Sequence, residues 1–126
     1  MTRRSVLSAM PAALALGSLL WTAPAAKARS GFDGDWSVLI ATTSGACDQA
    51  YRYGLQIVNG RITYPDQTIN VTGRVDGSGR VYVRVSAGGQ YATGYGRLSG
   101  NSGAGRWSGR GSTSACSGYW EAERRG

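Results

Sequence analysis

The feature that most constrains this chain is a succession of short segments in which apolar and polar residues alternate, with glycine between them. Glycine accounts for 20 of the 126 residues and proline for only 3. Alternation at every second residue is typical of strands with one buried face, and glycine between such segments is typical of tight turns. No segment after residue 28 has a sustained helical period. The sequence therefore predicts an all-β protein.

Eight segments carry the strand pattern, namely residues 35–42, 50–58, 61–64, 68–75, 80–86, 90–98, 106–110 and 116–124. Asn59-Gly60 is a strong signal for a two-residue hairpin, since both turn positions need a positive φ. Residues 99–105 are rich in serine and glycine and are expected to form a longer flexible loop. Short connections favour antiparallel pairing between neighbours. Eight strands in such a meander can close into an up-and-down β-barrel and so lose their edges.

The two cysteines are consistent with that topology. Cys47 follows the first predicted strand, and Cys116 begins the last. In an eight-stranded antiparallel meander both residues lie at the same rim, and closure of the barrel makes their strands neighbours. We therefore predict a Cys47–Cys116 disulfide, which needs the two residues close together and is typical of oxidising compartments. The alternative is a pair of free thiols.

The N-terminus has the three parts of a secretory signal. Arg3 and Arg4 precede an apolar run over residues 6–21, and Ala26-Lys27-Ala28 is a small-x-small cleavage pattern. The run is shorter than the roughly 20 apolar residues of a membrane span. We expect a signal peptide over residues 1–28, a single domain over residues 29–126 without a transmembrane segment, and a periplasmic or secreted location. General and twin-arginine export both remain open, since residues 2–7 also fit the twin-arginine pattern.

Composition excludes several kinds of chemistry. The chain has no histidine, which most serine and cysteine hydrolases use as a base and most zinc sites use as a ligand. Neither a phosphate-binding loop nor a dinucleotide fingerprint is present. We therefore expect no catalytic residues, no metal and no cofactor. If the protein were an enzyme, its candidate acid and base groups would be two carboxylate pairs, Asp33 with Asp35 and Glu121 with Glu123.

Aromatic residues supply the candidate core and binding positions. Gly-x-Trp occurs three times and places each of Trp36, Trp107 and Trp120 beside a glycine on the same strand face. Three such rings could form a ligand box, but in a small domain we favour a tryptophan core that fills the barrel. Tyr51 and Tyr53 share one strand face and are possible binding residues. Whether the interior is packed or hollow stays open.

Basic residues should lie on the outer face. Arg52, Arg74 and Arg84 alternate with apolar neighbours and are expected to point outward. Arg52, between the two tyrosines, is a further possible binding residue. Residues 29–126 hold eleven arginines against seven acidic residues, a net charge of +4. Such a face suits anionic lipid head groups or acidic polysaccharide, and an ordinary solvated surface is the simpler interpretation.

Three blocks of sequence resemble a group of small exported proteins of alphaproteobacteria without established function. They are residues 32–40 continuing to Cys47-Asp48-Gln49-Ala50-Tyr51-Arg52-Tyr53, residues 96–100 leading to Gly105-Arg106-Trp107-Ser108-Gly109, and residues 116–125. The resemblance implies no catalytic residues, and some members carry a label of haem utilisation or adhesion. Residues 29–126 lack His and Met, and their cysteines are expected to be paired, so only a tyrosine is left as a haem ligand.

These observations favour a monomeric, non-catalytic binding or interaction module of the bacterial envelope, with an unknown ligand or protein partner and no nucleic acid. Two alternatives remain. The first is an inhibitor of a secreted protease or lysozyme, which would use a rigid rim loop at residues 99–105 or 110–115. The second is the haem-related binding protein that the resemblance implies.

Overall fold

A computed structural model describes residues 31–126, and the predicted signal peptide lies outside the described residues. The described part consists of eight strands: β1 (Gly34–Ser44), β2 (Ala50–Val58), β3 (Arg61–Thr63), β4 (Asn70–Val75), β5 (Arg80–Ala87), β6 (Gln90–Ser99), β7 (Ser102–Arg110) and β8 (Ala115–Arg124). No helix long and apolar enough to cross a membrane occurs between residues 31 and 126.

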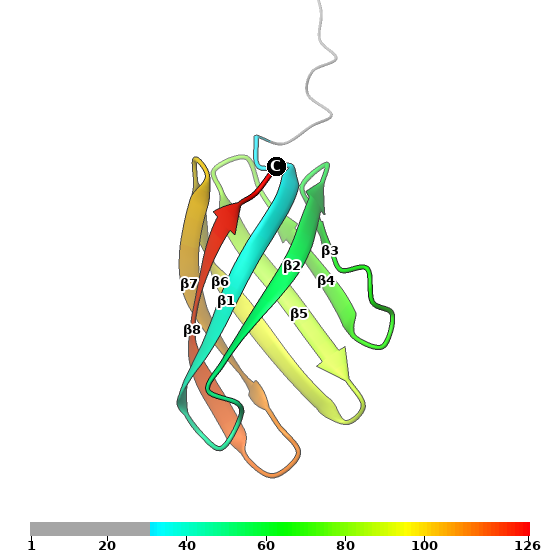
Figure 1. The fold of residues 1–126 in the computed structure, drawn as a ribbon, viewed down its shortest axis with the longest axis vertical. Coiled ribbons are helices and arrows are strands. Elements are labelled where there is room, and N and C mark those ends of the chain that lie inside the picture. The colour runs from blue at the N-terminus through cyan, green and yellow to red at the C-terminus, as the bar shows by residue number, and fades with distance from the viewer. Residues whose placement is uncertain (1–30) are drawn as a thin grey trace, which may run out of the picture.

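The eight strands form one closed barrel in chain order, and every neighbouring pair is antiparallel (Figure 1). Closure joins β1 to β8, with Trp36 opposite Arg124 at one end of the pairing and Ser44 opposite Ser117 at the other. The predicted all-β meander, its closure and the Cys47–Cys116 disulfide are confirmed. The bond closes a loop of 69 residues, which the chain-entropy model values at about 4 kcal/mol.

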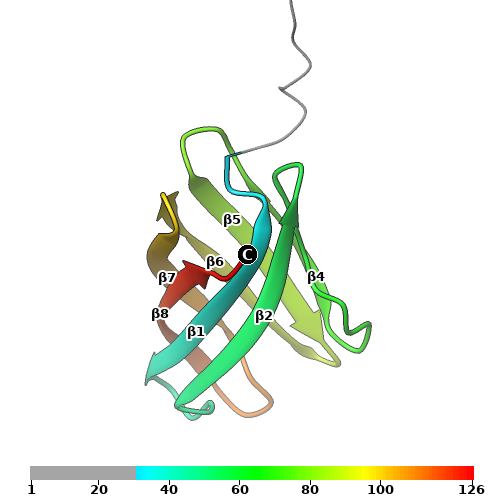
Figure 2. The ribbon, with the colours of Figure 1, turned by 45° about the horizontal axis from the view of Figure 1, so that its top comes forward.

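The turns alternate between the two ends of the barrel. The C-terminus lies at the same end as the β2–β3, β4–β5 and β6–β7 turns (Figures 1 and 2). The β2–β3 turn has the predicted two-residue form, with φ of 53° at Asn59 and 78° at Gly60. The carboxylate of Asp33 accepts hydrogen bonds from both backbone N–H groups of that turn, at 2.7 and 3.1 Å. The disulfide lies at the opposite end, beside the β1–β2 and β7–β8 loops.

The end that holds the C-terminus is closed by Trp36 and Arg124. Trp36 is 2 % exposed, and its indole N–H donates to the carbonyl of Phe32 at 2.8 Å. The guanidinium of Arg124 lies 5.1 Å from the centre of a Trp36 ring. It also donates to the carbonyls of Asp33, Gly31 and Gly100 and to the Asn101 side chain. One cation thus joins the N-terminal segment, the β6–β7 turn and β8 over the end of the core.

Glycines on the inner face of β6 and β7 make room for Trp120. A Cβ at Gly105 would lie 2.7 Å from Trp120 Cε2, and one at Gly96 would lie 2.7 Å from Trp120 Cζ2. Trp120 is buried, and its indole N–H donates to the carbonyl of Tyr95 at 3.2 Å. The inner face of the wall therefore has no side chains at the two positions where the Trp120 ring packs against it.

The same packing explains the one element that was predicted wrongly. Residues 99–105 are not a long loop: β6 continues to Ser99, and β7 begins at Ser102 after a tight turn. Two of the three glycines that suggested a loop lie in β7, where Gly103 faces Leu98 and Gly105 faces Trp120. Smaller differences occur at β3, which ends at Thr63 before Tyr64, and at β4, which begins at Asn70 rather than at Thr68.

The wall is weakest at β3, which has only three residues. It pairs with Gln56, Ile57 and Val58 of β2 and with two residues of β4. Between residues 31 and 126, no strand pairs with residues 50–55 on the side of β2 that faces β3. Residues 70–72 of β4 likewise have no strand partner on the side that faces β3. The main-chain hydrogen bonding of the barrel is thus interrupted along one seam between β2 and β4.

We expect Gly105→Ala to destabilise the protein by about 1–3 kcal/mol, because the new Cβ would overlap Trp120 and the carbonyl of Tyr95. Gly54→Ala is the matched control, since Gly54 also lies within a strand but a Cβ there meets nothing within 4 Å. Its effect should stay within about 1 kcal/mol. Urea denaturation followed by tryptophan fluorescence measures both, and equal stability of the two variants would contradict the packing described.

Candidate ligand-binding cavity

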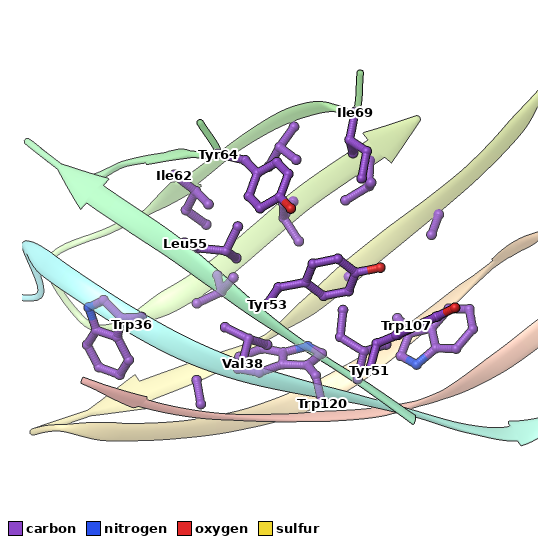
Figure 3. A pocket seen from close by; sticks show the side chains of 18 of the residues that line it. Trp36, Val38, Tyr51, Tyr53, Leu55, Ile62, Tyr64, Ile69, Trp107 and Trp120 are labelled. Atoms are coloured by element: carbon purple, nitrogen blue, oxygen red, sulfur yellow. The ribbon is translucent and has the colours of Figure 1, made fainter. Parts of the chain in front are cut away.

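The barrel contains an apolar cavity of about 310 Å³. Its lining comes from all eight strands or their ends and is dominated by aliphatic and aromatic side chains (Figure 3). Among them are Ile40, Leu55, Ile69, Val71, Val83, Val85, Ala92 and Trp107, which are all half-buried. Half-burial of inward-facing side chains means that the cavity communicates with the outside.

Burial along the barrel shows which end is open. Inward-facing side chains near the closed end, such as Ile62, Val81 and Leu98, are almost fully buried. Those nearer the disulfide are less buried, and Tyr51 is 49 % exposed. The cavity therefore has a floor at Trp36 and a mouth at the end where Cys47, Asp48 and Gln90 complete its lining.

Three tyrosines contribute polar groups to the wall of the cavity. The ring centres of Tyr51 and Tyr53 lie 5.8 Å apart, and those of Tyr53 and Tyr64 lie 6.0 Å apart in an edge-to-face arrangement. Figure 3 shows Tyr53 and Tyr64 between the Trp36 end and the Tyr51–Trp107 end. Tyr53 belongs to the part of β2 that lacks a β3 partner, and Tyr64 follows β3 directly. The tyrosines thus line the interrupted seam of the wall.

The tyrosine hydroxyls differ in their partners. The Tyr51 hydroxyl donates a short hydrogen bond to the carboxylate of Asp48, and this bond raises the pKa of Tyr51. Burial is the main cause that raises the pKa of Tyr53, with smaller contributions from Tyr64 and Asp48. The hydroxyls of Tyr53 and Tyr64 have no hydrogen-bond partner among residues 31–126. Tyr53 therefore presents a protonated, unpaired donor to the cavity at neutral pH.

The sequence-predicted binding residues separate into two groups. Tyr51 and Tyr53 lie together at the cavity, whereas Arg52 points to the outside and donates to the Ser37 hydroxyl at 3.3 Å. Tyr64 was not singled out as a binding residue. Its place on the same face as Ile62 was visible in the sequence, but its contact with Tyr53 depends on the β2–β3 pairing.

The three tryptophans of the Gly-x-Trp motifs occupy two kinds of position. Trp36 and Trp120 are buried in the core, and both also border the cavity. Trp107 is half-buried at the cavity wall, and its indole N–H donates to the carbonyl of Ala41 at 3.0 Å. All three indole N–H groups bond to backbone carbonyls. Each ring is therefore fixed by a hydrogen bond, and only Trp107 offers a partly open face.

Neither pair of carboxylates forms a joint acid–base site. Asp33 is engaged by the β2–β3 turn, and Asp35 accepts a hydrogen bond from the Gln56 side chain on the outside of the barrel. Glu121 and Glu123 point outward from β8, and Glu123 lies 3.4 Å from Arg125. Between residues 31 and 126, no group of three or more His, Cys, Asp or Glu side chains could hold a metal ion.

The rim loops bear on the inhibitor hypothesis. Residues 99–105 belong mainly to β6 and β7, so they provide no loop for a target cleft. Residues 111–114 do form a loop beside Cys116, and the N–H of Gly111 donates to the carbonyl of Ser114 at 2.9 Å.

Comparisons with known proteins give no match to a family model, to a curated protein or to a solved structure. The function must therefore be argued from the residues and from the cavity.

We expect part of the tyrosine titration of the native protein to lie above pH 10. The fold favours the phenol form of Tyr51 and Tyr53, so their stabilising contribution is complete below the unfolded pKa of about 10 and is lost as pH rises through the folded values. Ultraviolet absorbance of tyrosinate follows the titration, with circular dichroism as a check on the fold. Tyr53→Phe should remove part of the late component. Native and urea-denatured titrations that coincide would contradict the proposed environment.

Proposed function

We propose that this protein is a non-catalytic binding module that holds one small, neutral, largely apolar ligand inside its barrel. The observation that carries the proposal is the apolar cavity with a closed floor at Trp36 and an open mouth beside the disulfide. Ligand sites are usually concave and mostly apolar, with a few placed polar groups. The cavity has this composition.

The size of the cavity limits the ligand. A volume of about 310 Å³ is at the lower end of the usual range for small-molecule pockets, about 300–1,000 Å³. Eight-stranded barrels have interiors that side chains can fill or that can hold one small ligand. Here glycine replaces side chains along β6 and β7, and Trp120 occupies the space that they leave. The remaining volume lies against the valines of β4 and β5 and the tyrosines of β2.

The polar groups limit the charge of the ligand. The Tyr53 hydroxyl, whose raised pKa keeps it protonated and which has no hydrogen-bond partner among residues 31–126, favours a ligand with a hydrogen-bond acceptor. Asp48 is an acidic side chain at the mouth, and a negative charge there disfavours an anionic ligand. An apolar wall disfavours any ion that is not paired. A neutral molecule with a carbonyl or ether oxygen fits these conditions best.

The haem alternative has weaker support from the same residues. Among the residues that commonly hold haem iron, tyrosine is the one that could do so here, because the cysteines are bonded to each other. Iron ligation by tyrosine needs a phenolate, and the raised pKa of Tyr51 and of Tyr53 opposes its formation.

The first test uses a neutral fluorescent probe, N-phenyl-1-naphthylamine. We expect saturable binding with increased emission, because burial in an apolar cavity removes the probe from water. The double variant Val71→Phe/Val85→Phe should bind the probe at least about tenfold more weakly, since these cross-strand neighbours both line the cavity and two added rings take up its volume.

The matched control is Thr72→Phe/Ser86→Phe, which adds two rings at the next positions of the same strands, on the outer face. This variant should bind the probe as the unaltered protein does. Equal loss in both variants, or no saturable binding of the probe by the unaltered protein, would contradict a ligand site in the interior.

The second test concerns the tyrosine donors. We expect 2-acetylnaphthalene to displace the probe about tenfold better than naphthalene, because only the ketone accepts a hydrogen bond. In Tyr53→Phe/Tyr64→Phe this advantage should disappear, while the affinity for naphthalene stays the same. An advantage that persists in the double variant would show that the tyrosine hydroxyls do not contact the ligand.

A further inference from the structure

The charged residues on the outer surface of five consecutive strands are all basic. Strands β3 to β7 contain no Asp or Glu, and their outward positions carry seven arginines: Arg61, Arg74, Arg80, Arg84, Arg97, Arg106 and Arg110. All seven are exposed. We call these arginines, together with the outward Tyr82, Tyr91 and Tyr95, the basic face. The opposite strands are mixed in charge, with Asp35, Arg52, Glu121 and Glu123 pointing outward.

Like charges face each other directly within the basic face. Arg61 pairs with Arg74 across β3 and β4, and Arg80 pairs with Arg97 across β5 and β6. Directly opposed like charges destabilise a sheet, whereas opposite charges at the same positions would stabilise it. Two such pairs in one small barrel therefore lower the stability of the isolated fold. A polyanion on this surface would reverse the sign of that contribution.

Between residues 31 and 126, acidic side chains form no ion pair with the arginines of the basic face. The one ion pair found among residues 31–126 joins Arg125 to Glu123, so it includes none of the seven arginines. The nearest loop carboxylates are engaged locally. Asp66 accepts hydrogen bonds from Thr68, and Asp76 accepts them from Ser78 and from the backbone N–H of Arg80. Arg80 has an acidic neighbour, since the pKa of Asp76 is lowered mainly by the hydrogen bond from Ser78 and also by the charge of Arg80. The other six arginine heads are available to an external anion.

Exposed tyrosines are interleaved with the arginines. A single cross-strand row runs from Arg74 of β4 through Tyr82 and Tyr95 to Arg106 of β7. Tyr82 is 53 % exposed and Tyr95 is 55 % exposed, so each ring offers a face to the outside. Tyr91 lies opposite Arg110 in another outward row, separated from the first by the row that contains Arg84 and Thr93. Rings at such positions can stack on flat or weakly polar surfaces of a ligand while the guanidinium groups bind its anionic groups.

The shape of the basic face favours a flexible polymer. The face extends over five of the eight strands, which is more than half of the way around a closed barrel. Neighbouring strands lie about 4.8 Å apart, so Arg74 and Arg106 are separated by about 14 Å along the curved wall. A flat membrane touches only one side of a cylinder at a time. A flexible chain can follow the curvature and contact the whole face.

We propose that the basic face binds an acidic polysaccharide, with carboxylate or sulfate groups on the arginines and sugar rings on Tyr82 and Tyr95. Single-stranded nucleic acid has a similar combination of charge and rings. The disulfide favours the polysaccharide, because such bonds persist in oxidising compartments, where acidic polysaccharides rather than nucleic acids are the common polyanions. The basic face is separate from the cavity, so this proposal does not depend on the ligand inside the barrel.

The test measures binding of polygalacturonate to the disulfide-bonded protein by affinity electrophoresis at several salt concentrations, with neutral dextran as the reference polymer. We expect binding that weakens steeply with salt and no binding to dextran. Arg74→Gln/Arg106→Gln should bind about tenfold more weakly at 0.15 M salt. Arg52→Gln/Arg125→Gln removes the same charge from the opposite face and should bind as the unaltered protein does.

Further measurements make the test specific. Tyr82→Ala/Tyr95→Ala should weaken binding without changing its salt dependence, because it removes ring contacts and leaves every arginine. The Arg74→Gln/Arg106→Gln variant should still bind N-phenyl-1-naphthylamine, which separates this proposal from the cavity. Equal weakening by both arginine pairs would overturn the proposal, and so would tighter binding to phosphatidylglycerol vesicles or to a thymidine oligonucleotide than to polygalacturonate.

Discussion

Closure of β1 against β8 is the constraint on which the other features depend. The pairing places Trp36 opposite Arg124, which closes one end of the barrel, and it brings the strand that begins near Cys116 beside the strand that leads to Cys47. Because the circle contains eight strands, the interior is wide enough for side chains or for one small ligand. Once the circumference is fixed, the size of each inward side chain decides where the interior is filled.

The inward side chains divide the barrel into a filled and a hollow part. Glycines on β6 and β7 accept the indole of Trp120, so that wall and the closed end are packed. Valines on β4 and β5 are too short to reach across the barrel, and the tyrosines of β2 lie along the wall in contact with one another. The cavity is thus the volume that remains when large residues are concentrated on one side. Its mouth lies at the end beside the disulfide, and the wall next to its tyrosines is interrupted because β3 has only three residues.

Much of the fold could be predicted from the sequence because strand alternation and turn chemistry are local. The Asn59-Gly60 hairpin and the inward position of Tyr51 and Tyr53 needed no knowledge of distant residues. The glycines between residues 99 and 105 led to a wrong prediction, because glycine is common in flexible loops and also in strands that pack against a large aromatic ring. Only the position of Trp120 distinguishes the two. The volume of the cavity and the Tyr53–Tyr64 contact depend on register and closure, and no local pattern contains them.

The outer surface shows the same division between local and non-local information. Alternation predicts that Arg74 and Arg84 point outward, but it does not say which arginines become neighbours. The opposition of Arg61 with Arg74 is set by the β3–β4 register. That pair joins β3, the shortest strand of the wall, to β4, next to the seam that borders the cavity. Repulsion between the two guanidinium groups therefore acts on the strand that has the fewest main-chain partners to oppose it.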